Sequence, residues 1–515
     1  MRWLRMLGWT VLVLGIFWVA GRLIFAVPST AGRPLETALP FDGTTTLGPR
    51  AAEALAAHPG QSGVVALPDG RGALIGRLEL AAGAERSIDA MYYIWHDDES
   101  GLLLLDTLRD AAERGVRVRL LLDDNGIAGM DDTLAALNAM ENFSIRLFNP
   151  STVRNPKMLG YALYPLRMNR RMHNKAFIVD GAAAIVGGRN IGNEYFAFGE
   201  EPSYLDLDVL GVGAVVTDTE AIFDEYWNSA PVLALEQVIE GAGDLTDFEA
   251  AVAAAKDSDG AVELDAGNAR GPAGRMVRGG APPMEWTDVS VVADNPDKGM
   301  GKVDRDQLMI ARLGKILGEV EARLQLVSAY FVPGPRGSAF FADLARAGVE
   351  VSILTNSWEA TDVPMVHAGY VKYRRDLLEA GVRLYELKPV AGMPQGHDVL
   401  GPMGSSGASL HAKTFAADDA RVFIGSFNFD PRSAALNCEM GFLIDSPTIA
   451  GAMSNTLLNG MARRSFQPVL QGHDMVWQDP QPDGSVKEID HEPSLGFGDR
   501  IAVYVLNLLP IEWLL

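Results

Sequence analysis

Short apolar runs of the kind that form buried strands alternate along the chain with amphipathic segments of helical length. This order occurs in both halves, where an apolar run is followed by a helical pattern, a glycine and a second apolar run. The apolar runs end or lie at residues 92–95, 116–122, 330–332 and 349–354, and the helical patterns lie at 102–114 and 339–347. Strands that alternate with amphipathic helices indicate an α/β architecture with helices on both faces of a sheet. We therefore expect two layered α/β units.

Five residues of the first half recur in the second half at one spacing. The first set consists of His173, Lys175, Asp180, Gly187 and Asn190. The second set consists of His411, Lys413, Asp418, Gly425 and Asn428. Each pair is separated by 238 positions (411 − 173), without a gap, in a chain that has only eight histidines. Chance does not readily produce such a match, so the sequence indicates a duplicated unit.

The first set predicts a β-hairpin with polar groups at one end. His173 and Lys175 are two residues apart, so on a strand both side chains point to the same face. Apolar residues 176–179 continue the strand, residues 180–181 favour a hairpin turn, and residues 182–186 return as the partner strand. The second set predicts the same hairpin from the same pattern.

A loop after each hairpin offers further candidates for ligand binding. Small residues there let the backbone approach an anionic ligand closely. The expected approach residues are Gly187, Gly188, Gly425 and Ser426. Asn190 and Asn428 each offer a side-chain amide just beyond. Asp180 and Asp418 lie at the hairpin turns, away from the histidines, so we expect them to have a structural role.

Two such sets that face each other would make a phosphodiester site. They supply two imidazoles, two ammonium groups and two amides to a single anionic group. The ammonium groups and amides stabilise charge on the non-bridging oxygens. One histidine attacks phosphorus, and the other handles the proton of the leaving group.

Both ends of the chain are apolar. Residues 1–27 carry Arg2 and Arg5 before an apolar run that is long enough to span a bilayer if Arg22 snorkels. We expect a membrane anchor, with a cleaved signal peptide as the alternative. The two arginines favour a cytoplasmic N-terminus, which places the rest of the chain outside the inner membrane of a bacterium. Residues 501–515 are interrupted by a proline, so they either pack on the body or lie at the membrane surface.

Composition excludes several classes of function. The 66 acidic residues outnumber the 44 Lys and Arg residues, which disfavours nucleic acid as a partner. The small basic cluster of Arg167, Arg170 and Arg171 does not reverse this. Cys438 is the single cysteine, so an intrachain disulfide and a cysteine-based zinc site are excluded. The sequence contains no recognisable cofactor motif, and we expect neither a cofactor nor a metal.

The repeated His-x-Lys-x4-Asp pattern, followed by Gly-Gly or Gly-Ser and an Asn, resembles the paired signature of the phospholipase D superfamily. The resemblance covers residues 71–466. Residues 92–96 (Tyr-Tyr-Ile-Trp-His), 206–208 (Asp-Leu-Asp) and 509–513 (Leu-Pro-Ile-Glu-Trp) look most like the bacterial cardiolipin synthase branch. This resemblance implies two duplicated α/β/α layered domains with one active site at their pseudo-twofold interface.

The resemblance also implies roles for individual residues. His173 would be the nucleophile that forms a phosphatidyl-histidine, and His411 would protonate the leaving alcohol and deprotonate the incoming one. In this family an acidic residue downstream of each motif orients a histidine, and the candidates are Glu439 and Asp208. Their separation of 231 positions (439 − 208) departs from 238, which implies a seven-residue insertion in the first copy.

These observations divide the chain into six expected segments. They are a membrane anchor or signal segment (1–27), an N-terminal extension (28–70), a first phospholipase D-like domain (71–230), a partly helical and then flexible linker (231–290), a second phospholipase D-like domain (291–500) and an apolar C-terminal segment (501–515).

The expected activity is transfer of a phosphatidyl group from phosphatidylglycerol to a second phospholipid, which is cardiolipin synthesis. Two alternatives remain open at this point. One is a phosphodiesterase with the same chemistry that hydrolyses phospholipid or, less in keeping with the acidic composition, nucleic acid. The other is a catalytically silent envelope scaffold, which two intact motifs disfavour. The expected partners are phospholipids of the inner membrane, and a small accessory protein is left open.

Overall fold

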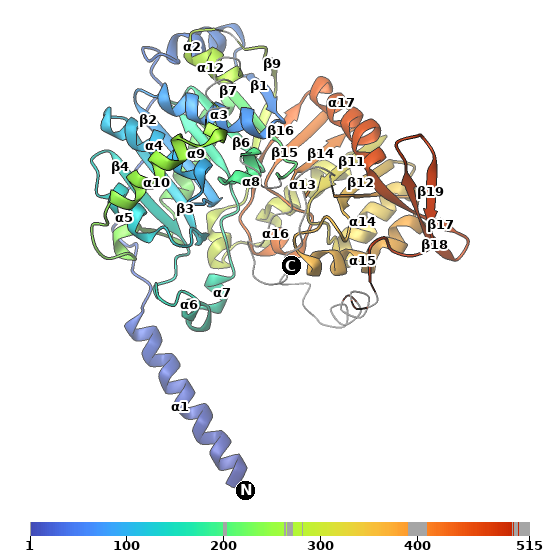
Figure 1. Cartoon of the computed structure of the whole chain (residues 1–515), viewed down its shortest axis with the longest axis horizontal. Coiled ribbons are helices and arrows are strands. Elements are labelled where there is room, and N and C mark those ends of the chain that lie inside the picture. The colour runs from blue at the N-terminus through green and yellow to red at the C-terminus, as the bar shows by residue number, and fades with distance from the viewer. Residues whose placement is uncertain are drawn as a thin grey trace.

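Two α/β units lie side by side, and one long helix extends away from them (Figure 1). The computed structural model describes residues 2–198, 203–261, 264, 271–280, 282–389, 409–496, 498 and 503. Within these residues each unit is built on one mixed sheet, with nine strands in the first and ten in the second. Of the apolar C-terminal segment expected at 501–515, all residues except Val503 lie outside the described residues.

The sheet of the first unit combines parallel and antiparallel pairing. Its centre is a parallel set, β2, β3 and β4, and an antiparallel set, β5, β6 and β7, continues from β2. In sheet order the strands are β8 (Val232–Ala234), β4 (Phe143–Phe148), β3 (Arg117–Gly126), β2 (Ser87–Ile94), β5 (Ala176–Val179), β6 (Ala183–Gly187), β7 (Asp208–Gly213), β1 (Ser62–Leu67) and β9 (Glu285–Thr287).

The sheet of the second unit repeats this arrangement. Its parallel set is β11, β12 and β13, and the antiparallel strands β14, β15 and β16 continue from β11. In sheet order the strands are β10 (Val289–Ala293), β16 (Met440–Asp445), β15 (Arg421–Gly425), β14 (Lys413–Ala417), β11 (Arg323–Ser328), β12 (Glu350–Asn356), β13 (Arg383–Leu387), β17 (Ser465–Gln471), β18 (Asp474–Pro480) and β19 (Val486–Ile489).

The two sheets therefore have one topology. The order β4-β3-β2-β5-β6-β7-β1 of the first unit corresponds to β13-β12-β11-β14-β15-β16-β10 of the second. The predicted hairpins are β5–β6 and β14–β15, so the two sequence motifs occupy equivalent places in equivalent sheets. The duplication read from the sequence is a duplication of fold.

Helices cover the outer face of each sheet. In the first unit these include α2 (Gly48–Ala57), α3 (Gly70–Ala82), α4 (Glu99–Glu113) and α5 (Asp131–Asn138), and in the second α13 (Met309–Gly318), α14 (Gly334–Arg346) and α15 (Pro364–Glu379). The inner faces of the two sheets pack together with α9 (Ala214–Trp227) and α17 (Pro447–Asn455). The predicted α/β/α layering is confirmed.

The contact between the units is an apolar core. Val186 and Val209 of the first sheet belong to the same buried cluster as Ile424 and Phe442 of the second. Because helices cover the outer face of each sheet and the other unit covers the inner face, its strands are apolar on both faces, which explains the uninterrupted apolar runs of the sequence. The units are thereby held in one orientation, with the ends of the two hairpins facing each other.

The segments expected outside the first domain also contribute to its sheet. β1 comes from the extension 28–70, and β8 and β9 come from the expected linker 231–290. Within the described part of that linker, α10 (Thr246–Lys256) packs on α4 and α12 (Pro272–Val277) packs on α3. These regions are structural parts of the first unit.

Helix α1 (Arg2–Ile24) extends away from the two units (Figure 1). It is long and apolar enough to cross a membrane, and its apolar side chains from Trp3 to Val19 are exposed. A helix of this kind at the N-terminus also fits a signal sequence, so its length and composition alone are consistent with both interpretations.

Candidate active site

The two units are joined at the site by two backbone bridges. Met172 pairs with Cys438, and Leu205 pairs with Leu410. The amide of His173 donates to the carbonyl of Cys438 at 2.8 Å, and the amide of His411 donates to the carbonyl of Leu205 at 2.9 Å. The two bridges are related by the duplication, and each brings a histidine of one unit beside an acidic residue of the other.

His173 is held by the second unit. Its Nδ1 lies 2.8 Å from Oε2 of Glu439 and 3.2 Å from the carbonyl oxygen of Ser426. Burial lowers the pKa of His173 to about 4, against the opposing effect of Glu439. The bond at Nδ1 leaves Nε2 as the ring nitrogen available to a ligand. Glu439 thus lies where the sequence predicts the orienting acid of the second copy.

His411 is held in the same way by the first unit, through Asp206. Nδ1 of His411 lies 2.6 Å from Oδ2 of Asp206. Burial and the nearby Lys413 ammonium lower the pKa of His411 to about 3. The hydrogen bond and charge of His411, with the nearby lysine, hold the pKa of Asp206 well below its usual range despite burial.

The assignment of this role to Asp208 needs correction. Asp208 is fully buried 2.9 Å from Arg77 and 3.4 Å from Arg189, and it stabilises these guanidinium groups. Asp206 and Asp208 are two residues apart, so alternation of side chains along a strand cannot distinguish them. The bridge between Leu205 and Leu410 places Asp206, and not Asp208, beside His411.

The two lysines lie directly behind the histidines. Nζ of Lys175 donates to the carbonyl of His173 at 2.6 Å, and Lys413 donates to the carbonyl of His411. Burial lowers the pKa of Lys175 well below its usual value and that of Lys413 to about 8. The ammonium groups therefore lie next to the imidazoles but are not among the described residues that line the cleft.

Both imidazoles open onto one cleft of about 480 Å³. Asn190 and Asn428, the amides expected from the sequence, also line it. Asn190 accepts a hydrogen bond from the amide of Ile94 at 3.2 Å and donates to the hydroxyl of Tyr195 at 3.0 Å, so its amide positions the cleft wall.

Aromatic rings complete the cleft; of these the sequence singles out only Tyr93, in the stretch 92–96, and not Tyr195 or Tyr204. The ring of Tyr204 stacks on His411 with 5.0 Å between centroids, and Tyr195 meets the same imidazole edge-on at 5.2 Å. Tyr93 meets His173 in the same manner at 5.1 Å. No periodicity marks these tyrosines, because they come from three separate segments that only the fold brings together.

The two motif aspartates lie at the far ends of the hairpins. Asp180 accepts hydrogen bonds from the amides of residues 85–87 at 2.8–3.1 Å. Asp418 accepts from the amides of residues 321–323 at 2.8–3.0 Å. Each therefore ties a hairpin turn to the segment that begins the neighbouring strand.

The small residues after each hairpin make room for the acids rather than for a ligand. A Cβ atom at Gly188 would lie 2.1 Å from Oδ1 of Asp206, and one at Gly187 would lie 2.1 Å from Oδ1 of Asp208. At Gly425 it would meet the backbone of the next strand, and Ser426 donates its hydroxyl to Glu439 at 2.5 Å. None of these four is among the described residues that line the cleft, which corrects their expected role as a phosphate-approach loop.

Comparison with known proteins identifies the architecture. A family model described as "Cardiolipin synthase, PLD-like domain" matches residues 78–227 and 314–459, one match in each unit. The chain belongs to this family. Cardiolipin synthase C of Escherichia coli is 43% identical over 462 residues, which cover 89% of this chain and 97% of that protein. A Helicobacter pylori protein described as uncharacterized is 30% identical over 97% of this chain and 98% of its own length.

A solved structure supports the fold of this cardiolipin synthase-like chain over nearly its whole length. The crystal structure of phosphatidylserine synthase from Haemophilus influenzae matches with a TM-score of 0.57 at 14% identity, and the match covers 92% of this chain and 100% of that one. Family and fold together make the chain a cardiolipin synthase-like phosphatidyltransferase of the phospholipase D type.

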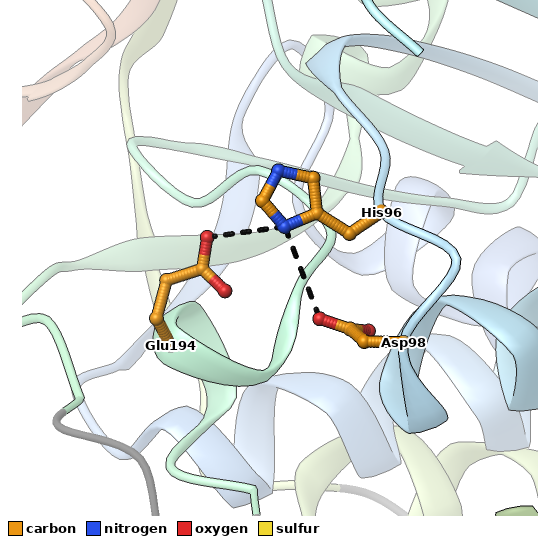
Figure 2. A group of neighbouring side chains, drawn as sticks. All are labelled: His96, Asp98 and Glu194. Atoms are coloured by element: carbon orange, nitrogen blue, oxygen red, sulfur yellow. Dashed lines mark ion pairs between the residues drawn. The ribbon is translucent and has the colours of Figure 1, made fainter. Parts of the chain in front are cut away.

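One group of described residues at the rim of this cardiolipin synthase-like cleft has the spacing of a metal site. Nδ1 of His96 lies 3.4 Å from Oε1 of Glu194 and 3.9 Å from Oδ2 of Asp98, and Figure 2 shows both carboxylates directed at this nitrogen. Asp98 also accepts hydrogen bonds from the amides of Gly101 and Asn193 at 3.0 and 2.6 Å. The group therefore fixes the rim, where α4 begins, as a hydrogen-bonded cluster.

Proposed function

We propose that this protein makes cardiolipin by moving a phosphatidyl group from phosphatidylglycerol to a hydroxyl group of a second phospholipid. One observation carries the proposal: two buried imidazoles face one cleft, and each is bonded through Nδ1 to a carboxylate of the other unit. This arrangement leaves two Nε2 atoms for one phosphodiester, which is what a two-step exchange at phosphorus requires.

In the first step we assign the nucleophile to His173. The Glu439 carboxylate accepts a hydrogen bond from Nδ1–H of His173, so the lone pair lies on Nε2. Nε2 attacks phosphorus, a P–N bond forms, and the P–O bond to the leaving glycerol breaks. The leaving oxygen takes a proton from Nε2 of His411, whose protonated form is stabilised by Asp206.

In the second step the exchange runs in reverse with a different alcohol. His411, now neutral, takes the proton of the incoming hydroxyl group. The oxygen of that hydroxyl bonds to phosphorus, and the P–N bond to His173 breaks. Lys175 and Lys413 lie behind the imidazoles, where their positive charge favours the anionic phosphoryl group in both steps.

The protonation of His411 before the first step depends on the substrate. In the cleft without a ligand its pKa is about 3, because it is buried beside the Lys413 ammonium. A phosphodiester anion in the cleft would oppose this effect and raise the pKa of His411. Substrate binding thus shifts His411 toward the protonated form that acts as the general acid.

We further propose that α1 remains attached and anchors the enzyme in the inner membrane of a bacterium, with the two units on the periplasmic side. The length of α1 is about 35 Å at 1.5 Å per residue, which exceeds the ~30 Å hydrocarbon layer. Arg2 and Arg5 at its start favour a cytoplasmic N-terminus. An anchored enzyme has its lipid substrates within reach of the cleft.

The test is a product analysis with the full chain reconstituted in vesicles of phosphatidylglycerol, with and without phosphatidylethanolamine. Cardiolipin is the expected product. Phosphatidic acid alone would show that water is the acceptor and would overturn the transfer reaction. No product in either mixture would favour a silent scaffold.

The matched variants are His173→Ala, His411→Ala and His473→Ala. The first two should lose nearly all turnover because both steps use both groups. His473 is exposed on the β17–β18 turn, so its substitution should leave turnover unchanged. After denaturation at mildly alkaline pH, where a P–N bond to histidine survives, the unsubstituted protein should retain labelled phosphatidyl group and His173→Ala should not.

A further inference from the structure

A short segment beside the cleft exposes large apolar side chains. Met158 is 73% exposed, Leu159 is 49% exposed and Leu166 is 72% exposed. They lie just before α6 (Leu159–Leu163), in α6 and in α7 (Pro165–Met168) respectively. Among the described residues beyond α1, few other large apolar side chains are this exposed, and those are scattered. A compact exposed apolar group of this kind marks an interaction surface.

This segment contacts the end of α1 where the helix joins the body (Figure 1). The indole of Trp18 donates to the carbonyl of Ala162 at 3.1 Å. The hydroxyl of Tyr164 donates to the carbonyl of Arg22 at 3.1 Å, and the Arg22 guanidinium lies over the Tyr164 ring at 4.6 Å. A side chain at Gly21 would meet Leu163 at 2.8 Å, so the two elements are in close contact.

The contact with α1 fixes the level of this segment relative to the membrane that α1 would span. Arg22 lies in the last turn of α1, and a cationic residue that stacks on aromatic rings is typical of the boundary between hydrocarbon and headgroups. Because α6 and Tyr164, the residue before α7, contact α1 at this same level, the exposed apolar side chains of the segment would reach the headgroup region of the membrane that α1 spans.

The charge of the segment fits a membrane surface. Residues 155–170 contain Lys157, Arg167 and Arg170 and no acidic residue, in a chain whose net charge is −22. Within the body Lys157 pairs with Asp124 at 3.1 Å and Arg167 donates to the carbonyl of Pro150, so the segment offers headgroups a local positive field rather than three free cations. Apolar side chains together with cations are what binds a helix to a surface of anionic lipids. The rest of this acidic protein would be repelled by the same surface.

The segment also leads directly into the active site. Tyr161 of α6 lines the catalytic cleft, and its hydroxyl donates to Asn125 at 2.8 Å. Residues 171–173 continue from the segment to the catalytic imidazole, and Arg171 is fixed by Asp123 at 3.0 Å. A surface that holds residues 155–170 therefore holds one wall of the cleft.

We propose that residues 155–170, here called the docking segment, bind the headgroup layer of an anionic phospholipid bilayer and hold the mouth of the catalytic cleft against it. This inference rests on the proposed anchor and on the proposed lipid substrates. Beyond anchoring by α1, the inference is that α1 and the docking segment form one contact with the membrane. This contact sets the orientation of the cleft, so that a lipid headgroup enters the cleft from the bilayer.

Depth measurement on the full chain tests the proposal without reference to catalysis. Three variants, Met158→Cys, Leu166→Cys and Val486→Cys, are labelled with an environment-sensitive fluorophore and reconstituted in phosphatidylglycerol-containing vesicles. Cys438 is fully buried, so the unsubstituted chain serves as the labelling blank. Val486 is an exposed control on β19, at an edge of the second sheet.

Lipids with brominated acyl chains should quench the labels at positions 158 and 166 at least about threefold more strongly than the label at 486. Equal quenching at all three positions would overturn the docking segment. Quenching does not depend on turnover. The test therefore remains valid even if the protein hydrolyses lipid or is inactive.

Activity gives a second readout. The double substitution Met158→Gln with Leu166→Gln replaces exposed side chains and should leave folding unchanged. We expect turnover to fall severalfold on vesicles and to stay unchanged on short-chain phospholipid dispersed in detergent, where no bilayer is present. Val486→Gln is the matched control. A double variant with normal turnover on vesicles would contradict the role of the segment in substrate access.

Discussion

Asp206 and His411 belong to different halves of the chain and meet at 2.6 Å across the interface between the two units. Glu439 and His173 form the reciprocal pair at 2.8 Å. Each unit thus carries a histidine whose orienting carboxylate comes from the other. Neither unit alone has a complete histidine–carboxylate pair, so we expect the catalytic geometry to form only when the apolar interface between the sheets is formed.

Because Asp206 orients His411 of the other unit and Asp208 does not, substitution of these two neighbouring aspartates should have different effects on turnover and stability. Asp206→Asn keeps the shape of the side chain but removes the charge that stabilises protonated His411. We expect kcat to fall by about 10²- to 10⁴-fold, because the imidazole loses the group that holds its tautomer and its proton. Cardiolipin formation in reconstituted vesicles measures the change, and the melting temperature should move little.

Asp208→Asn is the matched control two residues away. It leaves Arg77 without its carboxylate partner at a fully buried position, so the free energy of unfolding should fall by about 3–5 kcal/mol. Protein that remains folded should turn over normally. A normal rate for Asp206→Asn together with a lost rate for folded Asp208→Asn would reverse the assignment.

The contrast between these two residues shows what the sequence could predict. The histidines, the lysines and the hairpins were predictable because the motif is repeated without a gap and the hairpin is a local structure. Asp206 was not, because its role depends on the register of the bridge between Leu205 and Leu410, which are 205 positions apart (410 − 205). Once the two bridges are known, Leu205-Asp206 and Cys438-Glu439 are recognised as equivalent pairs.

The tyrosines of the cleft illustrate the same limit. Tyr93 is the last residue but one of β2, Tyr195 lies in the short helix α8 (Asn193–Phe196), and Tyr204 directly precedes the Leu205 bridge. Aromatic residues in apolar surroundings predict a core, and these rings are indeed largely buried. Only the docking of the two units directs them at the catalytic imidazoles.

The lowered pKa values of both histidines predict how stability depends on pH. In the unfolded chain a histidine binds a proton near pH 6.5, whereas His173 and His411 do so near pH 4 and 3 in the folded protein. Between these limits the unfolded state holds more protons, so the free energy of unfolding falls as pH falls, by about 1.4 kcal/mol per pH unit for each histidine. The stabilisation is fully present above pH 6.5.

Comparison with a double variant isolates this effect from other groups. His173→Gln with His411→Gln lacks both imidazoles, so its melting temperature should decline less than that of the unsubstituted protein between pH 6.5 and pH 4. Thermal unfolding in detergent at several pH values measures the difference. Parallel declines for the two proteins would mean that the histidines are not held neutral by the fold.

The motif aspartates should affect stability rather than catalysis, and to different extents. Asp180 is buried and satisfies three backbone amides, so Asp180→Ala leaves these donors without partners and should lower the free energy of unfolding by about 3 kcal/mol. Asp418 makes the equivalent bonds at a half-buried site, where water can replace it, so Asp418→Ala should cost about 1 kcal/mol. Turnover of the folded protein should persist in both, and a selective loss of turnover would assign the aspartates a direct part in the reaction.

A glycine at position 188 should be required for catalysis, because the carboxylate of Asp206 occupies the space that any side chain at position 188 would need. A Cβ atom there would lie 2.1 Å from Oδ1 of Asp206, so Gly188→Ala must displace the carboxylate that holds His411. We expect kcat to fall by about 10²-fold or more, since small shifts of a catalytic group are costly. Gly451→Ala is the control, because a Cβ at that position of α17 meets nothing within 4 Å. The equivalent position in the second unit is Ser426, whose hydroxyl donates to Glu439, so there a side chain supports the acid. Normal turnover of Gly188→Ala would show that Asp206 can move without consequence and would remove it from the machinery.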